Sequence, residues 1–205
     1  MPAVTLLDYG LGNIRAFYNI YVALGISVEV ATSSDRVSAA KRIVLPGVGS
    51  FDHAMVQLTR LGFREALGEA VQSRSIPILG VCVGMQMLMD RSEEGVEQGL
   101  GWIRGSVAKF REENSFDALP LPHMGWNRVS PCARHAIFGG LESPEFYFLH
   151  SYFCRPDDPS ESIGTTSYRA SFSSVIARGN IIGVQFHPEK SHGWGVRLLK
   201  NFAEL

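Results

Sequence analysis

The sequence predicts an α/β protein, with a central, mostly parallel sheet flanked by helices and an antiparallel extension in the second half. In the first half, short apolar runs alternate with longer helix-like segments, a rhythm typical of βαβ units. Two of the runs, RIVLP (42–46) and IPILGV (76–81), are almost continuously apolar, as strands covered by helices on both faces are. After Gly101, apolar runs follow one another with turn residues between them, which favours antiparallel strands.

These apolar runs predict the positions of the strands and helices along the chain. Strands are expected at 3–10, 27–32, 42–47 and 76–81, and helices at 13–24 and 51–72. In the second half, strands are expected at 102–110, 145–154, 162–169, 173–179 and 181–186, and a final helix at about 195–204. The stretch RPDDPSES (155–162) is expected to be an exposed loop within the domain.

Length and composition indicate one ordinary globular domain, residues 1–205. The chain has 205 residues, of which 45% are hydrophobic, and a formal net charge of −1. No Lys/Arg cluster accompanies that balance, so nucleic-acid binding is not expected. The N-terminal stretch lacks the regions of a signal peptide, and no apolar run approaches the roughly 20 residues of a membrane span. We therefore expect a cytoplasmic protein that does not bind membranes.

Cys82 is the candidate nucleophile. It follows the strand IPILGV and precedes GMQMLMD (84–90), which is expected to begin a helix. Gly80 and Gly84 flank it as in the nucleophile elbow G-x-S-x-G, where small neighbours permit a sharp strand-to-helix turn. A helix N-terminus favours the thiolate, and the backbone N–H of Val83 can point at a developing oxyanion. The alternative interpretation is a buried, unreactive cysteine.

The two remaining cysteines do not suggest a pairing. Cys132 and Cys154 lie far from Cys82 and from one another, and the sequence has no CxxC pair. Neither a disulfide framework nor a structural zinc site is therefore expected.

His187 is the candidate base for such a cysteine. It stands at the end of the apolar run 181–186 and is fixed by Pro188, with Glu189 two positions on. Spacing of two along an extended chain puts both side chains on one side, so Glu189 could hold the imidazole in the tautomer that accepts the thiol proton. A metal site of His187, Glu189 and His192 is the weaker interpretation, because no third ligand with recognisable spacing stands nearby.

Other polar motifs have a less specific meaning. For His53, His123, His135 and His192 we expect surface or hydrogen-bonded core histidines, whereas His150 is ambiguous. GLGN (10–13) suggests a phosphate loop, but Arg15 stands where G-x-G-x-x-G requires its third glycine. A dinucleotide site is therefore not expected.

Two motifs taken together carry a specific resemblance. GVCVGMQ (80–86) and GVQFHPEKS (183–191) resemble the class I, or triad, glutamine amidotransferases, in which a Cys-His-Glu triad on an α/β sheet hydrolyses glutamine and releases ammonia. Further motifs are similar to those of the glutaminase subunit of imidazole glycerol phosphate synthase, from histidine biosynthesis. They run nearly end to end: DYGLGN (8–13), LPGVGSF (45–51), SEEG (92–95), GLGWIRGSV (99–107), PHMGWN (122–127), FLHSY (148–152) and LLKNF (198–202).

The resemblance implies a role for each matching residue. It makes Cys82 the nucleophile, His187 the general base and then acid, and Glu189 the orienting carboxylate. It implies an oxyanion hole of backbone N–H groups, from Val83 and from the PGVG segment at Gly47 and Val48. It implies a substrate site with no cofactor and no metal, formed by Gly49, Gln86, Glu94, Ser151 and Tyr152. A solvated charge is the alternative for Glu94, and a simple turn is the alternative for PGVG.

The resemblance also implies a partner. In that family ammonia passes to a cyclase subunit, a (βα)₈ barrel, for the formation of imidazole glycerol phosphate and AICAR, and the two chains form a heterodimer. Candidate contacts with it are Asn13, Trp126 and Lys190, for which core packing of Trp126 and plain solvation of Lys190 are the alternatives. Val83, Ala16 and His192 depart from the residues expected in the family, so a paralogue that feeds another synthetase remains an alternative.

Two functions from other classes are weighed against this one. A thiol peptidase or esterase could use the same elbow, but neither explains Gln86, PGVG and PHMGWN together. A catalytically inactive binding subunit is the other alternative, and the presence of all three triad residues argues against it.

Overall fold

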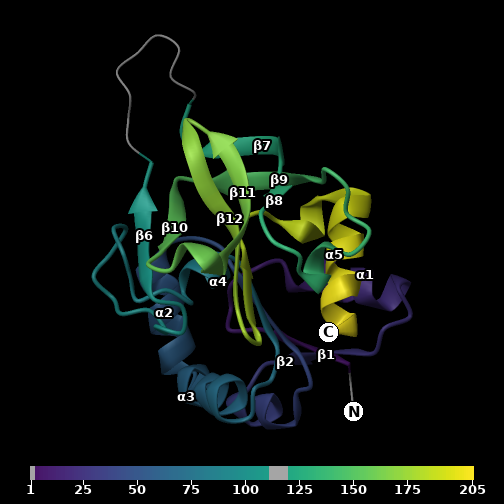
Figure 1. Ribbon diagram of the computed structural model, residues 1–205. Coiled ribbons are helices and arrows are strands. Elements are labelled where there is room, and N and C mark those ends of the chain that lie inside the picture. Colours follow the sequence, from purple (N-terminus) through teal and green to yellow (C-terminus); the bar gives the residue numbers. More distant parts are fainter. Residues whose placement is uncertain (1–2, 111–119) are drawn as a thin grey trace.

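The computed structural model describes residues 3–110 and 120–205 (Figure 1). Its centre is a sheet whose first half is parallel, in the order β2-β1-β3-β4-β13. These strands are β1 (Val4–Leu7), β2 (Val28–Ala31), β3 (Ile43–Gly47), β4 (Ile78–Cys82) and β13 (Ile181–Val184). Four of the five are buried along their whole length, as the apolar runs predicted.

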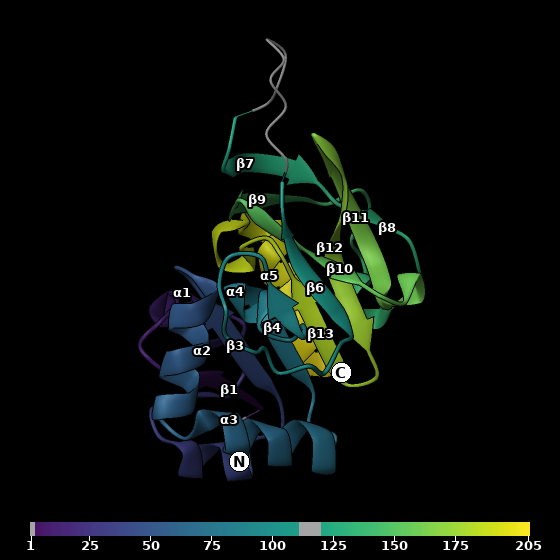
Figure 2. The same ribbon diagram turned by 90° about the vertical axis from the view of Figure 1, so that its left-hand side faces the viewer.

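The rest of the sheet is mostly antiparallel. Beyond β13 the order continues β12-β10-β6-β5, with β11 and β8 to the side, and only β5 and β6 pair parallel. A separate antiparallel pair, β7 and β9, lies over this half (Figures 1 and 2). The bounds are β5 (Arg91–Ser92), β6 (Gly105–Lys109), β7 (His123–Arg128), β8 (Ser130–Pro131), β9 (Glu145–His150), β10 (Tyr152–Pro156), β11 (Ser162–Tyr168) and β12 (Ala170–Arg178). The predicted fold class is confirmed.

Two strand predictions need correction. The run 145–154 is not one strand, because the chain leaves the small sheet at His150 and enters the large one at Tyr152. The run 181–186 does not belong to the antiparallel extension alone, since β13 pairs parallel with β4 on its other side. Strand β13 therefore joins the two halves of the sheet, and its carboxyl end lies beside that of β4.

Helices cover both faces of the parallel half. Helix α1 (Ile14–Ala23) contacts β1, β2 and α5 (His192–Glu204), and lies on the opposite side of the sheet from α2 (Phe51–Arg60) and α3 (Phe63–Gly68) in Figure 1. The shorter turns are η1 (Ser34–Ala39), η2 (Glu69–Ser73, a π-helical turn), η3 (Ala136–Phe138), η4 (Pro159–Glu161) and η5 (Pro188–Lys190). Among the described helices, none combines the length and apolar character needed to cross a membrane.

Two predicted helices differ from the structure. The segment 51–72 breaks after Arg60, because Gly62 adopts the left-handed conformation at φ 70° and ends the first helix. The helix after Cys82 is a single turn, α4 (Val83–Gln86), rather than the longer segment 84–90. Its continuation is prevented because the carbonyls of residues 87–89 accept hydrogen bonds from the backbone of residues 100–103 instead. The final helix begins three residues earlier than predicted.

Candidate active site

Cys82 is held in a strained turn at the carboxyl end of β4. Its φ of 56° and ψ of −114° lie in a region that residues other than glycine rarely adopt, and such outliers concentrate at functional sites. The side chain faces a cavity although the residue is only 4% exposed. The turn therefore presents the sulfur to the cavity, as a nucleophile elbow does.

Three glycines make this turn possible. A Cβ on Gly84 would collide with the carbonyl oxygen of Leu45 in β3, and a Cβ on Gly47 would collide with the backbone nitrogen of Gly84. A Cβ on Gly80 would lie 2.5 Å from the Gly84 oxygen. The turn after Cys82 thus packs directly on the backbone of β3, at Gly47 and Gly84, and on that of β4, at Gly80, which requires glycine at all three positions.

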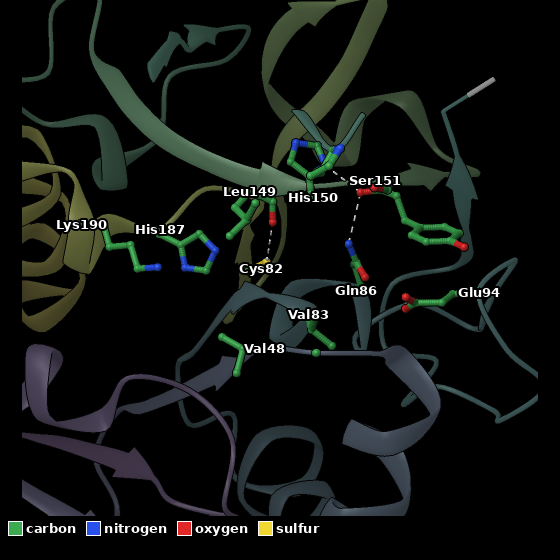
Figure 3. Close-up of a pocket in the computed structure, with 13 residues that line it drawn as sticks. Val48, Cys82, Val83, Gln86, Glu94, Leu149, His150, Ser151, His187 and Lys190 are labelled. Carbon is green, nitrogen blue, oxygen red and sulfur yellow. Dashed lines mark hydrogen bonds between the residues drawn. The ribbon is translucent and has the colours of Figure 1, made fainter. Parts of the chain in front are cut away.

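His187 and Glu189 form a buried pair beside Cys82. Nδ1 of His187 lies 2.9 Å from Oε1 of Glu189, and the two side chains are 4% and 2% exposed. Because the carboxylate can only accept, Nδ1 carries a proton, and Nε2 is the ring nitrogen that is left to exchange a proton with another group. Figure 3 shows the His187 ring pointing into the cavity next to Cys82.

The surroundings of His187 favour its protonated form. Burial by itself lowers the pKa of this imidazole, but hydrogen bonding to Cys82 and Glu189 and the negative charge of both raise the pKa to about 10. A cationic imidazole is the partner that a thiolate requires. Helix α4 is too short to supply the large dipole that the sequence led us to expect at Cys82.

The backbone around His187 is fixed from two sides. Its N–H donates to the carbonyl of Tyr147 in β9 at 2.8 Å, and its carbonyl accepts from the hydroxyl of Ser191 at 2.6 Å. The Ser191 hydroxyl also accepts from the N–H of Tyr147 at 3.0 Å. The backbone that carries the His187 ring is therefore held rigidly, as is required of a general base that must be accurately positioned.

A cavity of about 310 Å³ opens over the sulfur (Figure 3). It lies at the carboxyl ends of β3, β4 and β13, where ligands bind in open α/β sheets. Most of the residues proposed from the sequence line it. The lining consists of Val48, Gly49, Cys82, Val83, Gln86, Glu94, Pro122, Leu149, His150, Ser151, Tyr152, His187 and Lys190.

The PGVG segment lies along the side of the cavity formed by β3. Gly47 is the register partner of Cys82, and Val48 and Gly49 line the cavity. Gly49 has a φ of 91°, a conformation that favours glycine. The Tyr9 hydroxyl donates to the carbonyl of Pro46 at 2.7 Å and anchors the start of the segment.

Gln86 is a buried side chain with a fixed orientation. Its Nε2 lies 3.2 Å from the carbonyl oxygen of Tyr152 and 3.2 Å from Oε1 of Gln185. Since both partners are acceptors, the amide nitrogen must face them. The oxygen of Gln86 lies on the side of Glu94 in Figure 3.

Gln185 is a site residue that the sequence did not reveal. It is completely buried, and its Nε2 lies 3.8 Å from Sγ of Cys82. Its signal was its place in the run IIGVQF, where a polar side chain interrupts an apolar strand directly before the candidate base. A buried amide in that position needs polar partners, which here are the Cys82 sulfur and the Gln86 amide.

Glu94 has a structural partner as well as a place in the cavity. Its Oε2 accepts from the N–H of Phe51 at 2.8 Å, at the first residue of α2. Negative charge there complements the helix dipole. Glu94 is thus neither a freely solvated charge nor a side chain without other contacts.

The backbone of Ser151 and Tyr152 lies at the far wall of the cavity. The Ser151 carbonyl accepts from the N–H of Phe110 at 3.1 Å, and the Tyr152 carbonyl accepts from Gln86. Both carbonyls therefore have partners within the chain. The break between β9 and β10 at Ser151 turns this segment toward the cavity.

The three candidate partner contacts are solvent-accessible. Trp126 is 47% exposed, and its ring stacks on His192 with centroids 5.2 Å apart. Asn13 is exposed and caps α1, and the exposed Lys190 lies at the cavity with its Nζ 5.8 Å from the centroid of the Tyr147 ring. Asn13 and Lys190 follow β1 and β13 at the carboxyl edge of the parallel strands.

Comparisons with known proteins agree with this geometry. The model of the family "Glutamine amidotransferase class-I" matches residues 5–205. The chain is 50% identical over 203 residues to "Imidazole glycerol phosphate synthase subunit HisH" of Bdellovibrio bacteriovorus, covering 98% of this chain and 100% of that one. It is 44% identical to the subunit of the same name in Leptospira borgpetersenii, with the same coverage.

Solved structures show the same fold at much lower identity. A "glutamine amidotransferase" is 18% identical with a TM-score of 0.76, over 99% of this chain and 100% of that one. A "putative gmp synthase subunit a protein" from Thermoplasma acidophilum is 21% identical with a TM-score of 0.70, over 98% and 92%. At these identities the likeness concerns the fold alone.

Proposed function

The chain belongs to the class I glutamine amidotransferase family, and from this we propose that it is the glutaminase subunit of imidazole glycerol phosphate synthase in histidine biosynthesis. It is a glutamine amidotransferase enzyme, and we propose that residues 1–205 form one catalytic domain. The relatives that carry the subunit's name match over nearly the full length of both chains. The cavity around Cys82 supports the catalytic roles that we propose for its residues.

The first half of the reaction forms a thioester. The Cys82 sulfur attacks the side-chain amide carbon of glutamine, and the proton it has given up resides on Nε2 of His187. The amide oxygen becomes an oxyanion, which backbone N–H groups of Val83 and of the Gly47–Val48 segment stabilise. His187 then protonates the leaving nitrogen, so that ammonia departs and the glutamyl group remains on the sulfur.

The second half regenerates the enzyme. A water molecule gives one proton to His187 and attacks the thioester carbon, and the tetrahedral intermediate collapses to glutamate and the Cys82 thiolate. Glu189 keeps the imidazole in the Nδ1–H tautomer through both halves. The net reaction is glutamine and water to glutamate and ammonia.

Substrate recognition is assigned to the opposite wall of the cavity. The Gln86 oxygen and the Glu94 carboxylate supply acceptors for the ammonium group of glutamine, and Gly49 and the Ser151–Tyr152 backbone frame the α-carbon. A cavity of about 310 Å³ suits one amino acid. These assignments are supported by position and hydrogen-bonding capacity.

The partner is a cyclase subunit that consumes the ammonia. We propose that this (βα)₈ barrel docks over the carboxyl edge of the parallel strands, forms a heterodimer with the chain, and contacts Asn13, Trp126 and Lys190. Exposed Trp126 has the character of an interface residue, since tryptophan is enriched in binding hot spots. An enclosed path from the cavity would keep ammonia from escaping into water.

The observation that carries the proposal is the buried pair of His187 and Glu189 beside a cysteine on a strained elbow. The test compares release of glutamate from glutamine with hydrolysis of a panel of peptides and esters, with the chain alone and with the cyclase subunit. Selective glutamine hydrolysis supports the proposal. Turnover of peptides or esters without glutamine hydrolysis would identify a different thiol hydrolase, and no turnover with either would identify a binding subunit.

A further inference from the structure

Two buried histidines form a chain of hydrogen bonds behind the cavity. His123 in β7 and His150 in β9 are register partners, and their rings meet with Nδ1 of His123 3.0 Å from Nε2 of His150. On the inner side, Nδ1 of His150 lies 2.8 Å from the carbonyl oxygen of Tyr152. On the outer side, Nδ2 of Asn127 lies 3.2 Å from Nε2 of His123. Four residues are thus connected in series.

The partners fix the tautomer of both rings. The Tyr152 carbonyl only accepts, so Nδ1 of His150 carries a proton and, in the neutral ring, Nε2 of His150 is an acceptor. Nδ1 of His123 must then donate to it, which leaves Nε2 of His123 to accept from the Asn127 amide. Every donor in this series points from Asn127 toward Tyr152.

The environment keeps both rings neutral. Burial lowers the pKa of His150 to about 3 and the pKa of His123 to about 4. A proton added to His150 would set two N–H groups against each other across the 3.0 Å contact, and a proton added to His123 would do the same against the Asn127 amide across the 3.2 Å contact. At neutral pH the series therefore has one arrangement of donors and acceptors.

Packing also fixes the ring planes. The His123 ring stacks between Phe148 and Tyr168, at centroid distances of 4.7 Å and 3.9 Å. The His150 ring lies among the rings of Phe110, Phe148 and Phe172. Stacking among aromatic rings does not by itself require a polar ring at either position, whereas the hydrogen bonds of His123 and His150 do.

The inner end of the series continues to the reacting sulfur. The Tyr152 carbonyl accepts from His150 at 2.8 Å and from Gln86 at 3.2 Å. Gln86 also donates to Gln185, whose amide nitrogen lies 3.8 Å from the Cys82 sulfur. His150 provides the shorter of the two contacts to this carbonyl, at the residue where β10 begins.

We propose that His150, held by His123, is a positioning residue that fixes the Tyr152 carbonyl and thereby keeps the Gln86 amide nitrogen turned away from glutamine and its oxygen turned toward it. The inference rests on the proposed function, because it assigns Gln86 to substrate binding. Without the His150 donor, the Tyr152 carbonyl is no longer held in place, and the Gln86 amide can rotate and present its N–H groups to the ammonium group of the substrate. Binding of glutamine weakens, while the triad is unaffected.

The decisive comparison is between His150→Asn and His150→Gln. The asparagine amide reaches the place of Nδ1 and can still donate to Tyr152, whereas the glutamine amide reaches the place of Nε2 and cannot. Both variants are polar and lose the imidazole, and their side chains differ by only one methylene group. We expect His150→Gln to raise KM for glutamine by about tenfold with little change in kcat, and His150→Asn to stay near the unmodified enzyme. Phe153→Leu, which alters the same aromatic cluster without touching either histidine, is the control for loosened packing and should leave KM unchanged.

A double-mutant cycle shows whether His150 acts through Gln86. In the Gln86→Met background, exchanging His150 for glutamine should have little further effect on KM, because the group it positions is gone. Multiplicative effects of the two substitutions, or equal KM values for the Asn and Gln variants, would refute the positioning role. Assays are made with the cyclase present, and the unmodified enzyme serves as the reference for the proposed function itself.

A measurement on the unmodified chain tests the hydrogen-bonded series of histidines directly, without an activity assay and without any variant. Nitrogen-15 NMR of the imidazoles should show His123 and His150 both neutral and both protonated at Nδ1 at neutral pH. An Nε2–H tautomer or a cationic ring at either position would contradict the assignment, even if glutamine hydrolysis is confirmed. Conversely, absence of glutaminase activity with the expected tautomers would refute both the proposed function and the role of Gln86 in binding glutamine.

Discussion

Glu189 Oε1 lies 2.9 Å from His187 Nδ1, in a pair whose side chains are almost completely withdrawn from water. The two residues are separated only by Pro188, which begins the turn η5. The carboxylate therefore reaches the ring without a contribution from another part of the fold. The second oxygen, Oε2, is buried and has no hydrogen-bond partner among the described residues, so the charge of Glu189 acts mainly on His187.

Replacing Glu189 should be milder than replacing His187. Glu189→Gln keeps an oxygen that can accept from Nδ1 but removes the charge, and we expect kcat to fall by about 10- to 100-fold. His187→Ala removes the base itself, with an expected loss of about 10³-fold or more. Steady-state release of glutamate measures both. The reverse ranking would show that Glu189 does more than orient the ring.

The pKa of His187 predicts how stability depends on pH. The folded protein raises this pKa from 6.5 to about 10, so the native state binds the proton more tightly than the unfolded chain. The resulting stabilisation is complete below pH 6.5 and is lost as the pH rises toward 10. Urea unfolding of the unmodified chain and of His187→Gln should show a difference in unfolding free energy that shrinks over this interval. A difference that stays constant or grows would contradict the raised pKa.

Much of the fold could be predicted because, in the parallel half, the apolar runs of the sequence coincide with the strands that the tertiary structure buries. The apolar runs became β1, β3, β4 and β13, and Asn13 caps α1 where the helix was expected. The wrong prediction of a longer helix at 84–90 has a cause far away in the sequence. Whether the chain after Gln86 continues as a helix depends on backbone donors from residues 100–103, which no window around residues 83–90 reveals.

A pair of glycine substitutions tests the packing of the elbow. Gly84→Ala places a methyl group against the Leu45 carbonyl in β3 and should destabilise the fold by about 1–3 kcal/mol. Gly68→Ala is the matched control, because Gly68 is helical at φ −55° and no atom lies within 4 Å of the added carbon. That variant should be about 0.5–1 kcal/mol more stable. Equal unfolding free energies for the two variants would mean that the elbow can relax.

The partner should switch the glutaminase on. Gly49, at φ 91°, lets the peptide between Val48 and Gly49 reorient at modest cost, so contacts from a liganded cyclase can select the orientation with an N–H in the oxyanion hole. Loss of one such donor costs about 10²- to 10³-fold in rate. We expect the chain alone to be slower by a factor of this order than the complex with its nucleotide ligand. Equal rates would show a permanently formed oxyanion hole.

The candidate site was predictable to the extent that its residues stand in short motifs. Cys82, His187 and Glu189 come from two such motifs, and the structure brings them together at the ends of β4 and β13. Gln185, His123 and His150 could not be assigned in the same way. The role of each depends on the atoms that it contacts on other strands. From the sequence, a polar residue on a buried strand face indicates only that it must have a hydrogen-bond partner.

The central claim is that Cys82 is the nucleophile that attacks glutamine, and covalent capture by a glutamine analogue with an electrophilic carbon tests it most directly. The chain offers an internal comparison, since Cys132 is exposed and Cys154 is buried away from the cavity. Peptide mass spectrometry should find the label on Cys82 alone, excess glutamine should prevent it, and labelled enzyme and Cys82→Ala should both release no glutamate. Label on Cys132 with Cys82 unmodified, or glutamine hydrolysis that persists in Cys82→Ala, would overturn the account.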